Sequence, residues 1–165
     1  MIKFEKKAEG GTPNTTVTLP RDQREKSRLK VTLDDGREAG LFFEKGTSFQ
    51  DGDLIISYDE SVLVEIKAAD ETVSSVLCDD PLQLARACYH LGNRHIPLQI
   101  NEGILRYQHD HVLDNMVRGL GLEVKTEQAP FEPEAGAYSV GSHGGGEHHH
   151  HSHDHDDDHH HGHSH

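Results

Sequence analysis

Residues 72–128, TVSSVLCDDPLQLARACYHLGNRHIPLQINEGILRYQHDHVLDNMVRGLGLEVKTEQ, decide the fold of this chain. β-Branched and apolar residues bounded by turn residues predict four strands, at residues 72–78, 96–100, 104–108 and 122–128. Two further segments, residues 81–92 and 111–120, have helical periodicity instead. The predicted order β-α-β-β-α-β is that of the ferredoxin-like fold, an antiparallel sheet with two helices on one face.

Both predicted helices have one apolar side. In the first, Asp79 or Asp80 is the expected N-cap, Pro81 the first helical residue and Gly92 the end. Its apolar stripe includes Leu84, Cys88 and Leu91. The second has Leu113, Met116, Val117 and Leu120 on one side. We therefore expect both helices to pack against the sheet.

The chain before residue 70 alternates between apolar and polar residues with a period of two. Residues 28–43, RLKVTLDDGREAGLFF, have apolar residues at alternate positions on either side of a turn at residues 34–37, which predicts a β-hairpin. Residues 53–58 and 62–68 predict two more strands. No helical periodicity occurs here, so we expect residues 1–70 to form an all-β domain and the whole chain to be of the α+β class.

Composition divides the rest of the chain. We expect residues 71–142 to form the ferredoxin-like domain with a linker rich in Pro and Gly from residue 130, followed by a tail over residues 143–165. The net charge is −13 with histidine neutral, which argues against a nucleic-acid partner. The two cysteines, Cys78 and Cys88, have no disulfide or CxxC spacing, and no apolar run suits a signal peptide or a membrane span. These features predict a cytoplasmic protein that contacts no membrane.

The tail, HGGGEHHHHSHDHDDDHHHGHSH, has twelve of the 16 histidines of the chain. They are His143, His148, His149, His150, His151, His153, His155, His159, His160, His161, His163 and His165. Neutral imidazole is a common ligand of nickel, copper and zinc. A segment without apolar residues does not offset its ordering entropy, so we expect a tail that is disordered without metal and binds metal at several sites. The alternatives are an expression tag, which interrupted runs of four and three histidines do not favour, and an inert polar tail.

Four histidines lie outside the tail: His90, His95, His109 and His111. His90, near the end of the first helix, fits a surface role and a metal role equally well. A lone histidine such as His95 is more often structural than a ligand. His109 and His111 are separated by one residue, and in extended chain such side chains point to the same side and can chelate one metal. If Asp110 caps the second helix instead, the two rings diverge.

Two segments around these histidines carry a family resemblance. Residues 89–99, YHLGNRHIPLQ, and residues 108–116, QHDHVLDNM, closely resemble the urease accessory nickel metallochaperones. The GNRH stretch followed by PLQ is quite specific, and the resemblance extends over most of the chain, including a long histidine-rich tail. We therefore identify the chain as resembling the long-tailed form of this family.

The resemblance implies a function and an assembly. Members are homodimers, joined through the C-terminal domain, that carry Ni(II) to apo-urease. His95 is implied to lie at the dimer interface, where two copies share one metal. His109 and His111 resemble a peripheral site for nickel or copper. The N-terminal domain resembles a peptide-binding module, and the implied partners are the urease apoprotein complex and its nickel-delivery GTPase.

Metal chemistry adds two expectations. Cu(II) binds imidazole sites more tightly than Ni(II), and Zn(II) binds them as well, so nickel specificity has to come from geometry, partners or metal supply. Binding requires neutral imidazole, so affinity is expected to fall as the pH drops through about 6.5.

Two other functions compete with nickel delivery. A general buffer or store for divalent nickel, copper or zinc would need only the tail. A hydrolase using His109 and His111 is disfavoured, because the chain has neither an HExxH nor a GxxxxGK[ST] motif. We therefore expect no enzymatic activity.

Overall fold

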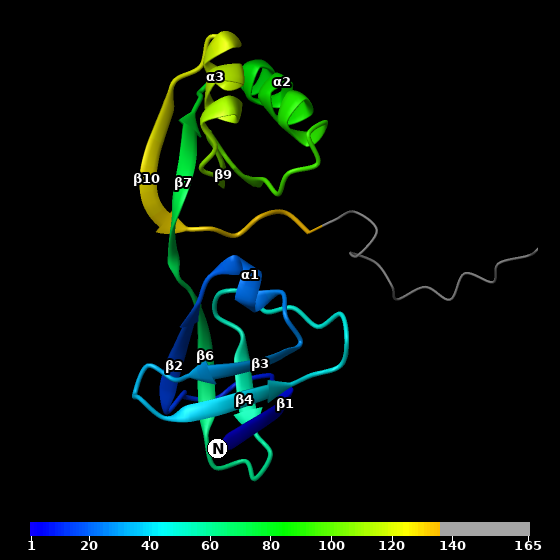
Figure 1. The fold of residues 1–165 in the computed structure, drawn as a ribbon, viewed down its shortest axis with the longest axis vertical. Coiled ribbons are helices and arrows are strands. Elements are labelled where there is room, and N and C mark those ends of the chain that lie inside the picture. Colours follow the sequence, from blue (N-terminus) through cyan, green and yellow to red (C-terminus); the bar gives the residue numbers. More distant parts are fainter. Residues whose placement is uncertain (136–165) are drawn as a thin grey trace, which may run out of the picture. The chain divides into compact units, whose positions relative to one another are not determined.

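Two β-sheets and three helices form residues 1–135, the part of the chain that this computed structural model describes (Figure 1). The α+β class expected from the sequence is confirmed. Within residues 1–135, no helix combines the length and apolar character that a membrane crossing requires. The predictions of a disordered tail and of tail ligands fall on residues 143–165, which lie outside the described residues.

The first sheet has six strands in the order β2-β6-β5-β1-β4-β3. Their bounds are β1 (Ile2–Ala8), β2 (Thr15–Leu19), β3 (Arg28–Thr32), β4 (Glu38–Phe42), β5 (Leu54–Ser57) and β6 (Leu63–Ala68). The predicted hairpin is confirmed, since β3 and β4 pair antiparallel with Leu29 opposite Leu41 and Val31 opposite Ala39. Alternate residues from the strands form one buried cluster, which includes Phe4, Val17, Leu41, Ile55, Val64 and Ile66.

Two elements of this region differ from the expectation. Strand β1 was not expected, because only Phe4 in it is fully buried; the strand is held by parallel pairing with β4 and antiparallel pairing with β5. The expectation of no helix before residue 70 is wrong by one turn, α1 (Arg21–Arg24). A four-residue helix is too short to produce a periodic apolar pattern. Its Arg24 is buried and donates a hydrogen bond to the carbonyl of Leu19 at 2.8 Å.

The second sheet has four strands in the order β10-β7-β9-β8, and every neighbouring pair is antiparallel. The strands are β7 (Asp70–Leu77), β8 (Gln99–Asn101), β9 (Ile104–Gln108) and β10 (Val124–Pro130). Helix α2 (Pro81–Gly92) connects β7 to β8, and α3 (His111–Gly119) connects β9 to β10. The strand-helix-strand-strand-helix-strand order is the one that the sequence predicted.

Both helices bury their apolar sides against the same face of this sheet, as Figure 1 shows. The shared cluster includes Val76, Leu105 and Tyr107 of the sheet, Ala87 and Leu91 of α2, and Leu113 and Val117 of α3. Asp80 is the N-cap of α2, and its carboxylate accepts a hydrogen bond from the backbone N–H of Leu82 at 3.0 Å. Of the two caps that the sequence allowed, the chain uses the one directly before Pro81.

Several bounds in this region were predicted incorrectly, and the strand expected at residues 122–128 is Val124–Pro130. The strand expected at residues 96–100 is reduced to Gln99–Asn101, because His95 has a left-handed backbone and Pro97 lacks the N–H that a strand ladder needs. The linker was expected to begin at residue 130, yet β10 includes Pro130 and the next residue, Phe131, is fully buried. Phe131 packs with Val73 and Ala129 in a separate cluster of buried residues.

Candidate metal centre

His95 lies in a turn that connects α2 to β8. Its backbone N–H donates a hydrogen bond to the carbonyl of Gly92 at 3.0 Å, and its φ is 57°, in the left-handed region. Histidine adopts this conformation at a cost of about 1–2 kcal/mol, and such strain is concentrated at functional positions. The side chain is exposed, so the turn presents an imidazole to solvent or to a second molecule.

His109 follows β9 directly, and one of its ring nitrogens has close polar neighbours. Its Nδ1 lies 3.2 Å from Oδ2 of Asp114 and 3.2 Å from Oγ of Ser74. The side chain of Asp114 is only 3% exposed, whereas that of His109 is 39% exposed. The two ring nitrogens of imidazole point away from each other, so Nε2 is the nitrogen on the side away from Asp114.

Asp110, between the two histidines of the HxH pair, caps α3. Its carboxylate accepts hydrogen bonds from the backbone N–H groups of Val112 at 2.8 Å and Leu113 at 3.3 Å. His111 is the first residue of the helix and is exposed. This is the arrangement for which the sequence predicted diverging rings, although the backbone of Asp110 itself is extended, with φ −151° and ψ 117°.

A small pocket brings His109 close to the segment that follows His95. The pocket has a volume of about 260 Å³ and is lined by Ile96, Pro97, Gln108, His109, Asp110 and Leu113. His90, by contrast, is exposed near the end of α2, where its ring packs edge to face on Tyr89 with centroids 5.3 Å apart. Among residues 1–135, no three or more His, Cys, Asp or Glu side chains are grouped closely enough to hold a metal ion.

The partners of His109 were not among the site residues predicted from the sequence. Asp114 accepts a hydrogen bond from the hydroxyl of Tyr107 at 2.6 Å as well as contacting His109. Burial, together with this carboxylate, raises the pKa of Tyr107 far above its usual value. One sequence feature pointed to the cluster: Asp114 is an acidic residue between Leu113 and Val117 on the apolar side of a helix.

The last described residues contact the segment that follows His95. The backbone N–H of Glu134 donates to the carbonyl of Leu98 at 2.7 Å, and that of Glu132 donates to the side-chain oxygen of Gln99 at 3.0 Å. The last described residues are therefore hydrogen-bonded to Leu98 and Gln99, which follow His95 by three and four positions in the sequence. The twelve predicted ligands of the tail lie outside the part of the chain that the structure describes.

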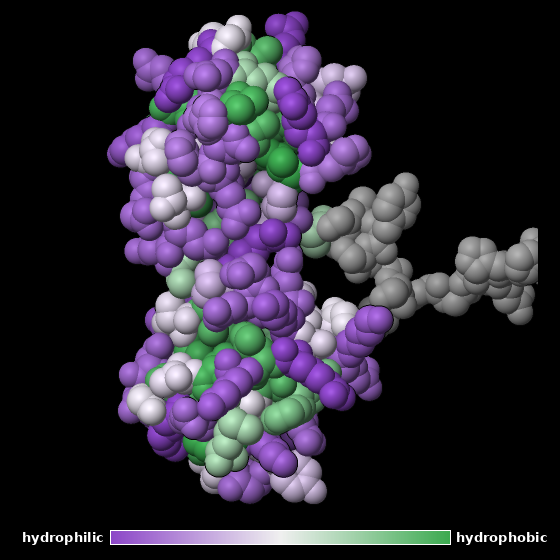
Figure 2. Space-filling view, in the orientation of Figure 1, coloured by the Kyte–Doolittle hydropathy of each residue, from purple (hydrophilic) through white to green (hydrophobic). Residues whose placement is uncertain are grey.

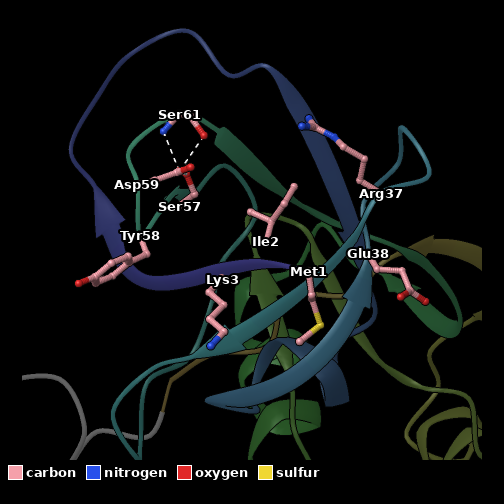
Figure 3. Close-up of a pocket in the computed structure, with 9 residues that line it drawn as sticks. All are labelled: Met1, Ile2, Lys3, Arg37, Glu38, Ser57, Tyr58, Asp59 and Ser61. Atoms are coloured by element: carbon pink, nitrogen blue, oxygen red, sulfur yellow. Dashed lines mark hydrogen bonds between the residues drawn. The ribbon is translucent and has the colours of Figure 1, made fainter.

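A larger pocket, of about 590 Å³, lies on the six-stranded sheet (Figure 3). Its lining comes from the start of β1, the residues around the start of β4 and the turn after β5: Met1, Ile2, Lys3, Arg37, Glu38, Ser57, Tyr58, Asp59 and Ser61. Tyr58 is 75% exposed. Hydrogen bonds from Ser57 and Ser61 lower the pKa of Asp59 to about 2, so this wall of the pocket is anionic at neutral pH.

The helices of the second sheet expose apolar side chains. Leu82 and Tyr89 of α2 are 58% and 67% exposed, and Val112 of α3 is 51% exposed. Figure 2 shows apolar surface over this helical region, and a further apolar area over the domain of the six-stranded sheet. Leu82 and Tyr89 are seven residues apart, which places them on the same side of α2.

Comparison with known proteins covers both sheets. The family model described as "UreE urease accessory protein, N-terminal domain" matches residues 5–69, and the model of the corresponding C-terminal domain matches residues 71–165. A "Urease accessory protein UreE" of Pseudomonas putida strain W619 is 62% identical over 135 residues, which cover 82% of this chain and 84% of the relative. A protein of the same name from Escherichia coli O157:H7 is 57% identical over 128 residues, covering 78% and 83%. The chain belongs to the UreE family of urease accessory proteins.

Proposed function

We propose that this protein is a nickel chaperone, which binds Ni(II) and delivers it to apo-urease while the urease active site is assembled. The observation that carries the proposal is the match of UreE family models to both of its domains, with relatives more than 55% identical over most of the chain. Nickel is the cargo of the protein, and its delivery is a transfer between ligand sets that requires no catalysis by this chain.

His95 is the proposed transfer ligand. The strand order β10-β7-β9-β8 and the two helices on one face support a ferredoxin-like assignment for the second domain. We assign homodimerisation to this domain, since the exposed Leu82 and Tyr89 of α2 offer an apolar surface close in sequence to the turn of His95. A two-fold axis near that turn would bring two His95 side chains to one Ni(II) ion.

The tail is the proposed collector of metal. Its twelve imidazoles offer several interchangeable weak sites for Ni(II), and for Cu(II) or Zn(II) when these are present. The hydrogen bond between Glu134 and Leu98 holds the chain, with eight residues left before the tail begins, to a residue three positions after His95. A short tether keeps bound metal at high effective concentration near the transfer ligand. Imidazole-rich, thiolate-poor sites also release metal more readily than a closed four-cysteine site.

His109 and His111 are the proposed ligands of a second, peripheral site for nickel or copper. The partly exposed ring of His109 and the exposed ring of His111 support this role. Because Asp110 caps α3, the two imidazoles need not act as one chelate, and each is available to accept or pass on a metal ion.

The N-terminal domain is the proposed partner-binding part. The pocket of about 590 Å³, in which Tyr58 is exposed and Lys3, Arg37, Glu38 and Asp59 are among the lining residues, offers both apolar and charged contacts to a peptide segment. We assign this surface to the urease apoprotein complex or its nickel-delivery GTPase, and we place the protein in the cytoplasm with them. The proposed division of labour is therefore 1–70 for partners, 71–142 for dimerisation and transfer, and 143–165 for metal collection.

Activation of purified apo-urease with its other maturation proteins tests the proposal. The nickel-loaded protein is expected to produce active urease at free nickel concentrations at which nickel alone produces little. Full activation by an equally loaded histidine-rich peptide, residues 143–165, would instead show that the chain acts only as a metal buffer. A pull-down with the urease maturation proteins provides an independent check of the partner assignment.

A further inference from the structure

A buried carboxylate lies behind His109. Among residues 1–135, Asp114 is the one acidic residue that is buried, at 2% exposure. Its Oδ1 accepts the hydroxyl hydrogen of Tyr107 at 2.6 Å, and its Oδ2 lies 3.2 Å from Nδ1 of His109. Both oxygens therefore have a partner. In the described part of the chain, no Lys or Arg side chain donates a hydrogen bond to Asp114.

Burial of this carboxylate needs a physical reason. An ionised carboxylate removed from water costs several kcal/mol unless it is paired or hydrogen-bonded. The hydroxyl of Tyr107 is a neutral donor and compensates only part of that cost. An imidazole whose other nitrogen binds a divalent cation supplies a much stronger donor, because the metal draws electron density from the ring.

We propose that Asp114 is a positioning residue that holds His109 in the tautomer with its proton on Nδ1, so that Nε2 is the atom that binds the metal. This inference rests on the proposed nickel-binding function. In this tautomer the Nδ1–H group has a carboxylate acceptor within reach, because Nδ1 lies 3.2 Å from Oδ2 of Asp114. With Nδ1 protonated, Nε2 keeps its lone pair on the side of the ring away from Asp114, and His109 lines the same pocket as Ile96 and Pro97.

Tyr107 completes the arrangement. It is fully buried on β9, two residues before His109, and its hydroxyl fixes the second oxygen of Asp114. The carboxylate cannot turn away from the imidazole without breaking this hydrogen bond. Ser74 from β7 and Thr126 from β10 place hydroxyl groups 3.2 Å and 3.5 Å from the same Nδ1 atom, so three elements surround one side of the ring.

His109 and His111 differ in the polar contacts that their imidazoles make. His111 is the first residue of α3 and is exposed, and the structure gives it no hydrogen-bond partner among residues 1–135. Its tautomer is therefore free to follow the metal. His109 is the pre-organised ligand of the pair, and His111 is the adaptable one.

The tautomer of His109 can be observed directly without metal. Long-range ¹H–¹⁵N spectra of the ¹⁵N-labelled, metal-free full-length chain, at a pH at which imidazole is neutral, distinguish a protonated Nδ1 from a protonated Nε2. The spectrum of a His109→Gln variant assigns the resonances. The wild-type chain is expected to have its proton on Nδ1. A proton on Nε2, the form that free imidazole side chains prefer, would overturn the proposal.

Asp114→Asn is the decisive variant, with Asp79→Asn as its matched control, because Asp79 is exposed and has no hydrogen bond that the structure records. The first replacement is expected to shift His109 toward the Nε2-protonated form, and the control is expected to leave it unchanged. Because the readout is taken without metal, failure of nickel delivery to urease does not affect it. If Asp114→Asn lowers stability too far, Tyr107→Phe takes its place, and the same shift of smaller size is expected.

Nickel binding provides the second readout. In a full-length chain with its twelve tail histidines replaced by serine, the His109 resonances disappear as paramagnetic Ni(II) occupies this site. Asp114→Asn is expected to raise the nickel concentration needed by roughly 10- to 100-fold, the usual effect of removing such an outer partner. If the folded Asp114→Asn variant needs the same nickel concentration as its parent and keeps the same His109 tautomer, Asp114 serves only the packing of α3.

Discussion

The backbone N–H of His95 donates a hydrogen bond to the carbonyl of Gly92 at 3.0 Å, and this turn holds His95 at a φ of 57°. Because a left-handed backbone strains every residue with a Cβ, the proposed ligand is placed where glycine would be more stable. His95→Gly is therefore expected to leave the free energy of unfolding unchanged or to raise it by up to about 1 kcal/mol, while nickel binding at the transfer site is lost. Urea unfolding and nickel titration of the same samples check both parts.

His95→Asn is the matched control for this prediction. Asparagine adopts the left-handed region more readily than most residues but offers no imidazole. It should lose nickel binding with little change in stability. A decrease of more than about 1 kcal/mol in the free energy of unfolding of either variant would indicate that the imidazole stabilises the turn by packing rather than binding metal.

The exposed side of α2 predicts the oligomeric state. Replacing Leu82 and Tyr89 together by serine removes two apolar side chains that are 58% and 67% exposed, so the stability of the monomer should change by less than about 0.5 kcal/mol for each replacement. The dimer should nevertheless dissociate at protein concentrations at which the wild type stays dimeric, as measured by analytical ultracentrifugation. An unchanged dimer would place the interface elsewhere.

The length of the tether between the fold and the tail predicts the rate of delivery. If tail-bound nickel reaches His95 within one molecule, tripling the chain between Glu134 and the tail with glycine and serine should lower its effective concentration about fivefold, by the −3/2 power of length. Urease activation at limiting nickel should slow accordingly, while total nickel bound stays the same. A rate independent of tether length would mean that the tail does not feed His95.

Asp59 predicts a local pH dependence in the N-terminal pocket. Hydrogen bonds from the Ser57 and Ser61 side chains and the Ser61 backbone lower its pKa from 3.8 to about 2. The carboxylate is therefore charged in the folded protein throughout the neutral range, and the stability it contributes is present above about pH 4 and is lost as the pH falls from there toward about 2. A ¹³C NMR titration of its carboxyl group checks the value, and Ser57→Ala should raise the midpoint. A wild-type midpoint near 3.8 would contradict the hydrogen-bonded turn.

Strongly patterned elements of this fold were predictable from sequence. The β3–β4 hairpin and α2 followed from local rules, because alternation around residues 34–37 and a capped helix with Pro81 at its start are both short-range features. Strand β1 was not predictable, since it is stabilised by neighbours more than thirty residues away along the chain. The later start of the linker was missed because the burial of Phe131 depends on tertiary packing.

The candidate site was also predictable only in part. The histidines were identifiable as individual residues, since imidazole chemistry depends on residue type. Their surroundings were not: Asp114 reaches His109 only because α3 folds back onto β9, which the spacing of the two residues does not specify. A polar residue on the apolar side of a predicted helix, as Asp114 is, remains the one local indication of such a contact.

The most direct test of the central claim is a calorimetric nickel titration of the dimeric full-length chain with its twelve tail histidines replaced by serine, beside the same chain with His95→Asn. The tightest site is expected to take one Ni(II) per two chains and to be abolished by His95→Asn, while weaker binding at His109 remains. The absence of such a site, or an equally tight one in the His95→Asn chain, would contradict shared coordination by the two His95 residues and would leave metal collection by the tail as the main activity.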